Sequence, residues 1–147
     1  MSHTKEPANI QYVLLSAFRA SNTPLVNLTN HQALVESIEE LGGCVIESTA
    51  LTGCYLEEGQ SWPSTEKTIR VRCDEPWQVA NVVWLAWCYY EQECVLVYES
   101  QTHTASLQAP CEFTQIGTSQ KAPKGYLNDS PAGAYTIDEH GEVWICR

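Results

Sequence analysis

The order of apolar and amphipathic segments between residues 11 and 99 constrains the fold of this chain more than any other feature. Strand-like segments and two helix patterns follow one another in the order β-α-β-β-α-β, the split βαβ arrangement. The strand-like segments are residues 12–18, 44–56, 68–73 and 94–98, and the helix patterns are residues 30–41 and 76–91. We therefore predict an α+β fold, a ferredoxin-like βαββαβ sandwich with two helices on one face of an antiparallel sheet.

Local signals support the predicted helix ends. Thr29 and Gln32 fit a capping box before the first helix, and the pair Gly42 and Gly43 is a stop signal after it. Pro76 fits the first turn of the second helix. These signals predict that residues 19–30 form a polar loop rich in asparagine between the first strand and the first helix.

The strand at residues 68–73 alternates strictly. Ile69, Val71 and Cys73 point to one face, and Arg70 and Arg72 point to the other. In a sandwich of this kind the arginines lie on the open face of the sheet. That face is a candidate contact surface for a homo-oligomer, since the arginines can meet carboxylates of a second copy.

The chain is expected to form a single domain, residues 1–147, with its βαββαβ core at residues 11–99. The pattern weakens after residue 100. We expect residues 100–147 to be a loop-rich extension that ends in a β-hairpin at about residues 134–146.

The net charge of −10 belongs mostly to the middle of the chain. Residues 36–99 carry twelve acids against three bases. Such a surface repels nucleic-acid backbones, so we expect no direct nucleic-acid binding. It suits a partner protein with a basic surface, or it serves only to keep the protein in solution.

The seven cysteines indicate a reducing compartment. Their number is odd, no C-x-x-C pair occurs, and most lie in apolar patterns. No apolar run reaches the ~20 residues that a membrane helix needs, and no secretory signal is recognisable. The expectation is a cytoplasmic protein that is not associated with a membrane.

No motif for catalysis, metal binding or a cofactor is recognisable in the sequence. The four histidines are scattered, no pair has zinc spacing, and there is no glycine-rich phosphate loop. Adjacent acids such as Glu39 and Glu40 point apart, so they do not predict a pair for acid–base catalysis. Whether the chain is an enzyme stays open, and the balance favours a non-enzymatic protein with no cofactor and no metal.

Two functional hypotheses follow. The first is an acidic interaction module, such as a phage or mobile-element accessory protein that binds and inhibits or modulates a host protein engaged in nucleic-acid handling or defence. Exposed tryptophans ringed by acids are typical docking residues. The residues predicted to bind the partner are Glu39, Glu40, Glu57, Glu58, Trp62 and Trp77.

The second hypothesis is a binding protein for a small anionic or nucleotide-like ligand. Polar groups gather between the first strand and the first turn of the first helix, where free amide hydrogens favour anions. Gln92 joins them if the first and fourth strands are neighbours. The predicted ligand-binding residues are Arg19, Asn22, Asn30, His31 and Gln92.

Residues 17–99 also resemble the DUF3293 family of small bacterial and phage proteins with no assigned function. The resemblance rests on the loop from Ala17 to Asn22, on Asn27 and Asn30, on the region of Glu66 and on residues 89–97. The family's usual Asn-Pro step is absent, because Thr23 separates Asn22 from Pro24. The resemblance implies an intracellular protein and supplies no catalytic residues.

Overall fold

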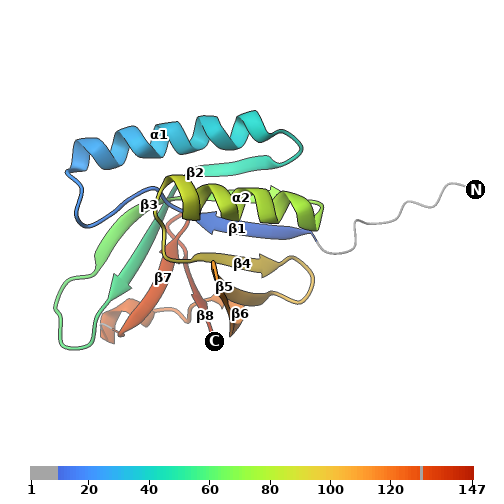
Figure 1. Ribbon diagram of the computed structural model, residues 1–147. Helices are drawn as coiled ribbons and strands as arrows, with labels where there is room; N and C mark the ends of the chain where they lie inside the picture. Colours follow the sequence, from blue (N-terminus) through green and yellow to red (C-terminus); the bar gives the residue numbers. More distant parts are fainter. Residues whose placement is uncertain (1–9, 130) are drawn as a thin grey trace, which may run out of the picture.

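The computed structural model describes residues 10–129 and 131–147, so residues 1–9 and 130 of the predicted single domain lie outside it. The described chain forms eight strands, two α-helices and one short 3-10 helix (Figure 1). In chain order these are β1 (Gln11–Leu15), α1 (Pro24–Leu41), β2 (Val45–Leu56), β3 (Ser64–Cys73), α2 (Pro76–Tyr89), β4 (Val95–Glu99), β5 (Thr104–Ala109), β6 (Glu112–Lys121), η1 (Tyr126–Asp129), β7 (Gly133–Ile137) and β8 (Val143–Cys146).

The strands close into an antiparallel barrel. Around the barrel the order is β1-β3-β2-β7-β8-β6-β5-β4, and β4 returns to β1. β1 lies between β3 and β4, with Val13 opposite both Val71 and Val97. Figure 1 shows both helices on one side of the barrel and β5 to β8 on the other side. Every strand therefore has two neighbours.

The main hydrophobic core lies outside the barrel, between its wall and the two helices. Alternate residues of β1, β3 and β4 face the helices and are buried. The buried contacts from the strands are Val13, Leu15, Ile69, Val71, Val95 and Val97, and those from the helices include Leu34, Ile38, Val82, Val83 and Ala86. This arrangement follows from the period of two in the strands and of 3.6 in the helices.

The other alternate residues of the same strands face the barrel interior. Tyr12 and Leu14 of β1, Leu96 and Tyr98 of β4, and Arg70 of β3 line the cavity there. The interior is thus more polar and aromatic than the core under the helices. One sheet serves two different environments, one on each face.

The prediction of a ferredoxin-like sandwich is wrong. The first six elements occur in the predicted order, but residues 100–147 supply four more strands that close a barrel over the second sheet face. Arg70 points to that face as the alternation indicates, and there it forms ion pairs with Glu47 and Glu139 of the same chain. The strands that close the barrel pair with segments far away in the sequence, as β7 does with β2 where Ile137 lies opposite Thr52. No local sequence pattern predicts such pairs.

The first helix starts earlier than the sequence signals indicate. Thr23 is its N-cap, and the Thr23 hydroxyl accepts a hydrogen bond from the Val26 amide at 3.3 Å. Pro24 takes the first helical position, where its missing N–H costs nothing. Thr29 is inside the helix and donates to the Leu25 carbonyl at 2.9 Å. The second half of the expected asparagine-rich loop is therefore helix. Within the described ranges, no helix has the length and apolar character needed to cross a membrane.

Candidate active site

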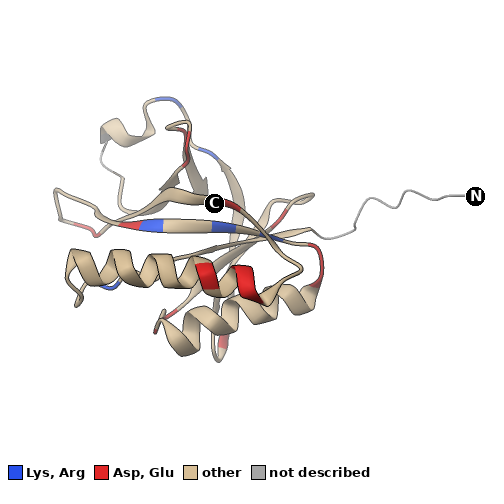
Figure 2. Ribbon diagram, turned by 90° about the horizontal axis from the view of Figure 1, so that it is seen from above, with Lys and Arg blue, Asp and Glu red and all other residues tan. Residues whose placement is uncertain are grey.

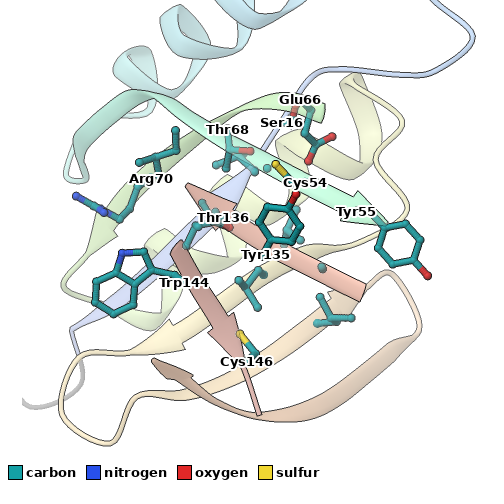
Figure 3. Close-up of a pocket in the computed structure, with 18 of the residues that line it drawn as sticks. Ser16, Cys54, Tyr55, Glu66, Thr68, Arg70, Tyr135, Thr136, Trp144 and Cys146 are labelled. Carbon is teal, nitrogen blue, oxygen red and sulfur yellow. The ribbon is translucent and has the colours of Figure 1, made fainter. Parts of the chain in front are cut away.

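A cavity of about 860 Å³ occupies the inside of the barrel (Figure 3). This volume lies within the roughly 300–1,000 Å³ that is usual for small-molecule sites, and an eight-stranded barrel is wide enough for one small ligand. Its walls are built by residues from β1, β2, β3, β4, β7 and β8, together with some from β5 and β6. The cavity is therefore the candidate active site.

Glu66 of β3 is a carboxyl group on the cavity wall without a protein partner. No residue in the described part of the chain donates a hydrogen bond to it or forms an ion pair with it. Burial raises the pKa of Glu66 above its ordinary value, because the ionised form loses water and gains no compensating contact. Carboxyl groups with a shifted pKa on a cavity wall are candidates for functional sites.

Thr68 follows two residues later on the same strand face. Its hydroxyl is buried and has no hydrogen-bond partner among the described residues. Buried hydroxyls are normally paired, because leaving one unpaired costs about 1–3 kcal/mol. Figure 3 shows Thr68 between Glu66 and Arg70 along the wall. An unpaired hydroxyl beside an unpaired carboxyl indicates that both serve a ligand.

The Arg70 end of the cavity is different, because its polar groups are already paired. The Arg70 guanidinium donates to Glu47 at 3.2 Å and to Glu139 at 3.5 Å. The Trp144 indole N–H donates to Asp138 at 2.9 Å. These contacts fix the shape of this end and leave few groups free to bind a ligand.

Aromatic rings line the cavity near Arg70. The rings of Tyr12 and Tyr98 are stacked, with centroids 5.0 Å apart. Burial raises the pKa of Tyr98 to about 12, although Arg70 opposes the shift, so its hydroxyl stays protonated. Flat aromatic faces suit a ligand that has a flat ring or a diffuse positive charge.

Three cysteines also line the cavity: Cys54, Cys94 and Cys146. Burial raises the pKa of each thiol, and for Cys54 the nearby Tyr135 hydroxyl only partly opposes this. The thiolate is the nucleophilic form of cysteine. The cavity therefore keeps its thiols in the unreactive form at neutral pH.

The residues predicted to bind a small ligand separate into two groups. Arg19 and Gln92 do line the cavity. Arg19 forms an ion pair with Glu91 at 2.8 Å, and Gln92 donates to the Phe18 carbonyl at 3.1 Å. Both residues therefore have a structural partner as well as a face toward the cavity.

Asn22, Asn30 and His31 do not line the cavity. His31 is buried between α1 and β2, where its Nε2 donates to the Thr49 carbonyl at 2.9 Å. The asparagine that holds the loop together is Asn27, whose side chain bonds both the amide and the carbonyl of Arg19. Asn27 and Arg19 both line the cavity, so this part of the asparagine-rich segment shapes the backbone at the cavity wall.

The residues predicted to bind a partner protein are exposed and lie on separate elements. Trp62 is 83% exposed in the loop between β2 and β3, and Trp77 is 57% exposed in the first turn of α2. Glu39 and Glu40 are on α1, whereas Glu57 and Glu58 follow β2; all four are exposed. Figure 2 shows acidic positions on a helix and on several strands and loops. None of these six residues lines the cavity.

Sequence reasoning missed Glu66 and Thr68 as a pair, although a signal existed. The alternation that assigns Arg70 to one face of β3 assigns Thr68 and Glu66 to the same face. Sequence alone did not show that this face would be enclosed. In residues 10–129 and 131–147, no cluster of three or more His, Cys, Asp or Glu side chains is arranged to hold a metal ion.

The geometry defines a class of protein: a closed β-barrel with an internal cavity that has polar and aromatic walls and the volume of a small-molecule site. Comparison with known proteins agrees. The model of the S-adenosylmethionine lyase family matches residues 13–147. The S-adenosylmethionine lyase of Enterobacteria phage T3 is 44% identical to this chain over 153 aligned positions, which cover 98% of each protein. The chain belongs to the S-adenosylmethionine lyase family.

This membership corrects two predictions. The resemblance to DUF3293 is wrong, because the matching family is that of S-adenosylmethionine lyases over nearly the whole chain. The interpretation as a non-enzymatic inhibitor or modulator of a host protein is also wrong, since the relative is named as an enzyme. The activity was not recognisable in the sequence, because the cavity residues form no short motif. Closure of the barrel brings them together.

Proposed function

We propose that this protein is an S-adenosylmethionine lyase and that it binds its substrate inside the barrel. The observation that carries the proposal is the unpaired Glu66 carboxyl beside the unpaired Thr68 hydroxyl on the cavity wall. Family membership names the substrate, and these two groups supply acceptors that the protein itself does not use.

The cavity matches the chemistry of S-adenosylmethionine. The molecule carries a sulfonium, an ammonium, two ribose hydroxyls and a flat adenine ring, together with one carboxylate. Glu66 and Thr68 offer oxygens to the ammonium or to the ribose hydroxyls, both of which donate hydrogen bonds. The stacked Tyr12 and Tyr98 present aromatic rings to the same cavity.

A lyase breaks the carbon–sulfur bond without adding water. In the reaction we propose, an oxygen of the substrate's own carboxylate attacks the γ-carbon. A carbon–oxygen bond forms, the γ-carbon–sulfur bond breaks, and its electron pair goes to sulfur. The products are homoserine lactone and neutral 5′-methylthioadenosine, and the ammonium keeps the single net positive charge, so no proton has to move.

The environment favours this reaction for an electrostatic reason. A carboxylate and a sulfonium lose their charges as the bond forms, so bulk water stabilises the charged ground state more than the transition state, and binding inside the barrel lessens this difference. No protein nucleophile is required. This agrees with the raised pKa values of Cys54, Cys94 and Cys146, which limit side reactions with an electrophilic substrate.

A cytoplasmic location is part of the proposal. All seven cysteines are free thiols, which is usual for proteins in a reducing compartment.

Product analysis tests the proposed function. The purified protein is incubated with S-adenosylmethionine in water enriched in oxygen-18, and the products are identified by mass spectrometry at early times. We expect 5′-methylthioadenosine together with homoserine lactone that carries no heavy oxygen. S-adenosylhomocysteine as the product, or no loss of substrate, would contradict the proposal.

A further inference from the structure

Gly53 is an unusual residue at the centre of a strand. The chain has eight glycines, and Gly53 alone has no positive φ. Its backbone conformation is therefore open to any residue. Glycine weakens a strand interior by roughly 0.5–1 kcal/mol relative to alanine, so its presence in β2 needs a reason other than backbone conformation. Close approach of another group is such a reason.

The approaching groups are the two unpaired cavity residues. A Cβ atom at position 53 would lie 2.6 Å from the Thr68 hydroxyl oxygen, 3.0 Å from Glu66 Cγ and 3.2 Å from Glu66 Oε1. Real Cβ atoms do not approach other heavy atoms as closely as 2.6 Å. Glu66 and Thr68 therefore converge on the space that a side chain of residue 53 would fill.

The strand register explains this convergence. Gly53 of β2 lies opposite Glu66 of β3 on one side and opposite Thr136 of β7 on the other. Side chains directly opposite each other in antiparallel strands are close neighbours. Glu66 can fold down over β2 only because its opposite residue has no side chain.

We propose that Gly53 is a positioning residue, whose missing side chain forms a slot that holds the Glu66 carboxyl and the Thr68 hydroxyl in the geometry that receives the substrate. The inference rests on the proposed function, in which these two groups bind S-adenosylmethionine. In Gly53→Ala the added methyl group rotates the hydroxyl and displaces the carboxyl. Displacements of about 1 Å in a site cost up to about 10²-fold in rate.

Two measurements on full-length protein test the proposal. The first is kcat and KM for S-adenosylmethionine cleavage. Gly53→Ala is expected to lower kcat/KM by about 10²-fold while the protein stays folded. The matched control is Ser48→Thr, which adds one methyl group to the same strand outside the cavity, and it is expected to keep wild-type kinetics.

The second measurement does not depend on catalysis. The free energy of unfolding is followed from pH 4.5 upward for the wild type, Gly53→Ala, Glu66→Gln and the double variant. The raised pKa of Glu66 makes wild-type stability fall with rising pH, whereas His31 acts in the opposite direction below pH 6.5. His31 is unchanged in all four proteins, so its effect cancels when the slopes are compared, and the neighbouring Cys54 and Cys94 stay uncharged because their pKa values are raised. Gly53→Ala is expected to change the pH slope of the wild type and to leave the pH slope of Glu66→Gln unchanged.

The two measurements separate the possible failures. If the wild type does not cleave S-adenosylmethionine, the proposed function fails, and the pH slopes still decide whether Gly53 positions Glu66. If Gly53→Ala is folded and retains both wild-type kcat/KM and the wild-type pH slope, the positioning role is overturned. A change of the pH slope by Gly53→Ala that is the same with and without Glu66 would also overturn it, because the change would then not arise from the Glu66 carboxyl.

Discussion

At the scale of single residues, the cavity contains groups that are unfavourable in the empty protein. Among residues 10–129 and 131–147, the partly buried Glu66 carboxyl and the buried Thr68 hydroxyl have no hydrogen-bond partner. Natural proteins retain such groups where function needs them, at a cost in stability. The candidate site should therefore show a trade-off between stability and activity.

Glu66→Gln is expected to stabilise the protein without ligand at pH 7. The pKa of Glu66 is raised in the folded state, so the folded state binds more protons than the unfolded state above pH 4.5. The contribution of Glu66 to the free energy of unfolding is therefore fully present below pH 4.5, and it is lost as the pH rises through the folded-state pKa. Urea titrations over this range measure the effect, and equal stability of the wild type and Glu66→Gln at pH 7 would contradict it.

His31 is expected to act in the opposite direction. Its Nε2 donates to the Thr49 carbonyl, so the neutral ring has an unprotonated Nδ1, which is buried and has no hydrogen-bond partner in the described part of the chain. Burial lowers the pKa of His31, and Lys67 adds to this. The unfolded state therefore binds more protons below pH 6.5, and stability falls as the pH drops below that value.

His31→Gln tests this expectation, because glutamine keeps a donor for Thr49 and cannot titrate. Thermal unfolding of both proteins between pH 5 and pH 8 is the measurement. The wild type should lose more stability than His31→Gln on the acid side. Parallel pH profiles would show that His31 carries no part of the dependence.

At the scale of elements, the sequence patterns predicted which segments form strands and helices between residues 11 and 99. The alternation in β3 also predicted the face of Arg70. The start of α1 was missed because Thr29 and Gln32 mimic a capping box inside the helix, whereas the observed cap is Thr23 followed by Pro24. Capping patterns of this kind also occur inside helices, and tertiary contacts decide at which of them the helix begins.

Gln78 is expected to be the most important polar side chain for the position of α2. Its Oε1 accepts from the amides of Asp74 and Glu75 at 2.7 and 3.0 Å, and its Nε2 donates to the Gly43 carbonyl. Gln78 is buried and its three hydrogen bonds are partly buried, so Gln78→Ala leaves three backbone groups without this partner and should cost about 2 kcal/mol.

Urea unfolding measures this cost. The matched control is Gln32→Ala on α1, since Gln32 is exposed and its side chain donates to the exposed Glu36 at 3.3 Å. The control should change stability by less than about 0.5 kcal/mol. A similar loss in both variants would contradict the role of Gln78 as a link between α2 and the turn before β2.

At the scale of the whole molecule, closure of the barrel creates the cavity, and closure was not predictable from the sequence. The barrel closes through the pairing of β6 with β8 and of β2 with β7, for example Gln120 with Ile145 and Gly53 with Thr136. These pairs join segments that are distant in the chain. Strands β5 to β8 have short or irregular patterns, so residues 100–147 gave no sign that they enclose the sheet. Glu66 and Thr68 were individually visible, but their shared enclosure depended on these distant pairs.

Gly117→Ala is expected to weaken the pairing of β6 with the end of the chain after β8. Gly117 has a φ of +98°, and a Cβ there would lie 2.6 Å from the Arg147 carbonyl carbon. Thr118 and Arg147 exchange backbone hydrogen bonds beside it. Strain and the lost pairing should together cost about 3 kcal/mol.

Gly59→Ala is the matched control for that variant. Gly59 has a similar φ of +85° but nothing within 4 Å of an added Cβ. It should cost only about 1 kcal/mol, from backbone strain. Equal losses in the two variants, measured by urea unfolding, would show that crowding at Gly117 has no effect.

In the proposed function, the Glu66 carboxyl inside the barrel serves the cleavage of S-adenosylmethionine. The most direct test compares kcat/KM for Glu66→Gln with that for Glu112→Gln, a matched change at an exposed position outside the cavity. We predict a loss of about 10²-fold or more for Glu66→Gln in a folded protein, and wild-type kinetics for Glu112→Gln. Wild-type kinetics for Glu66→Gln would contradict the account.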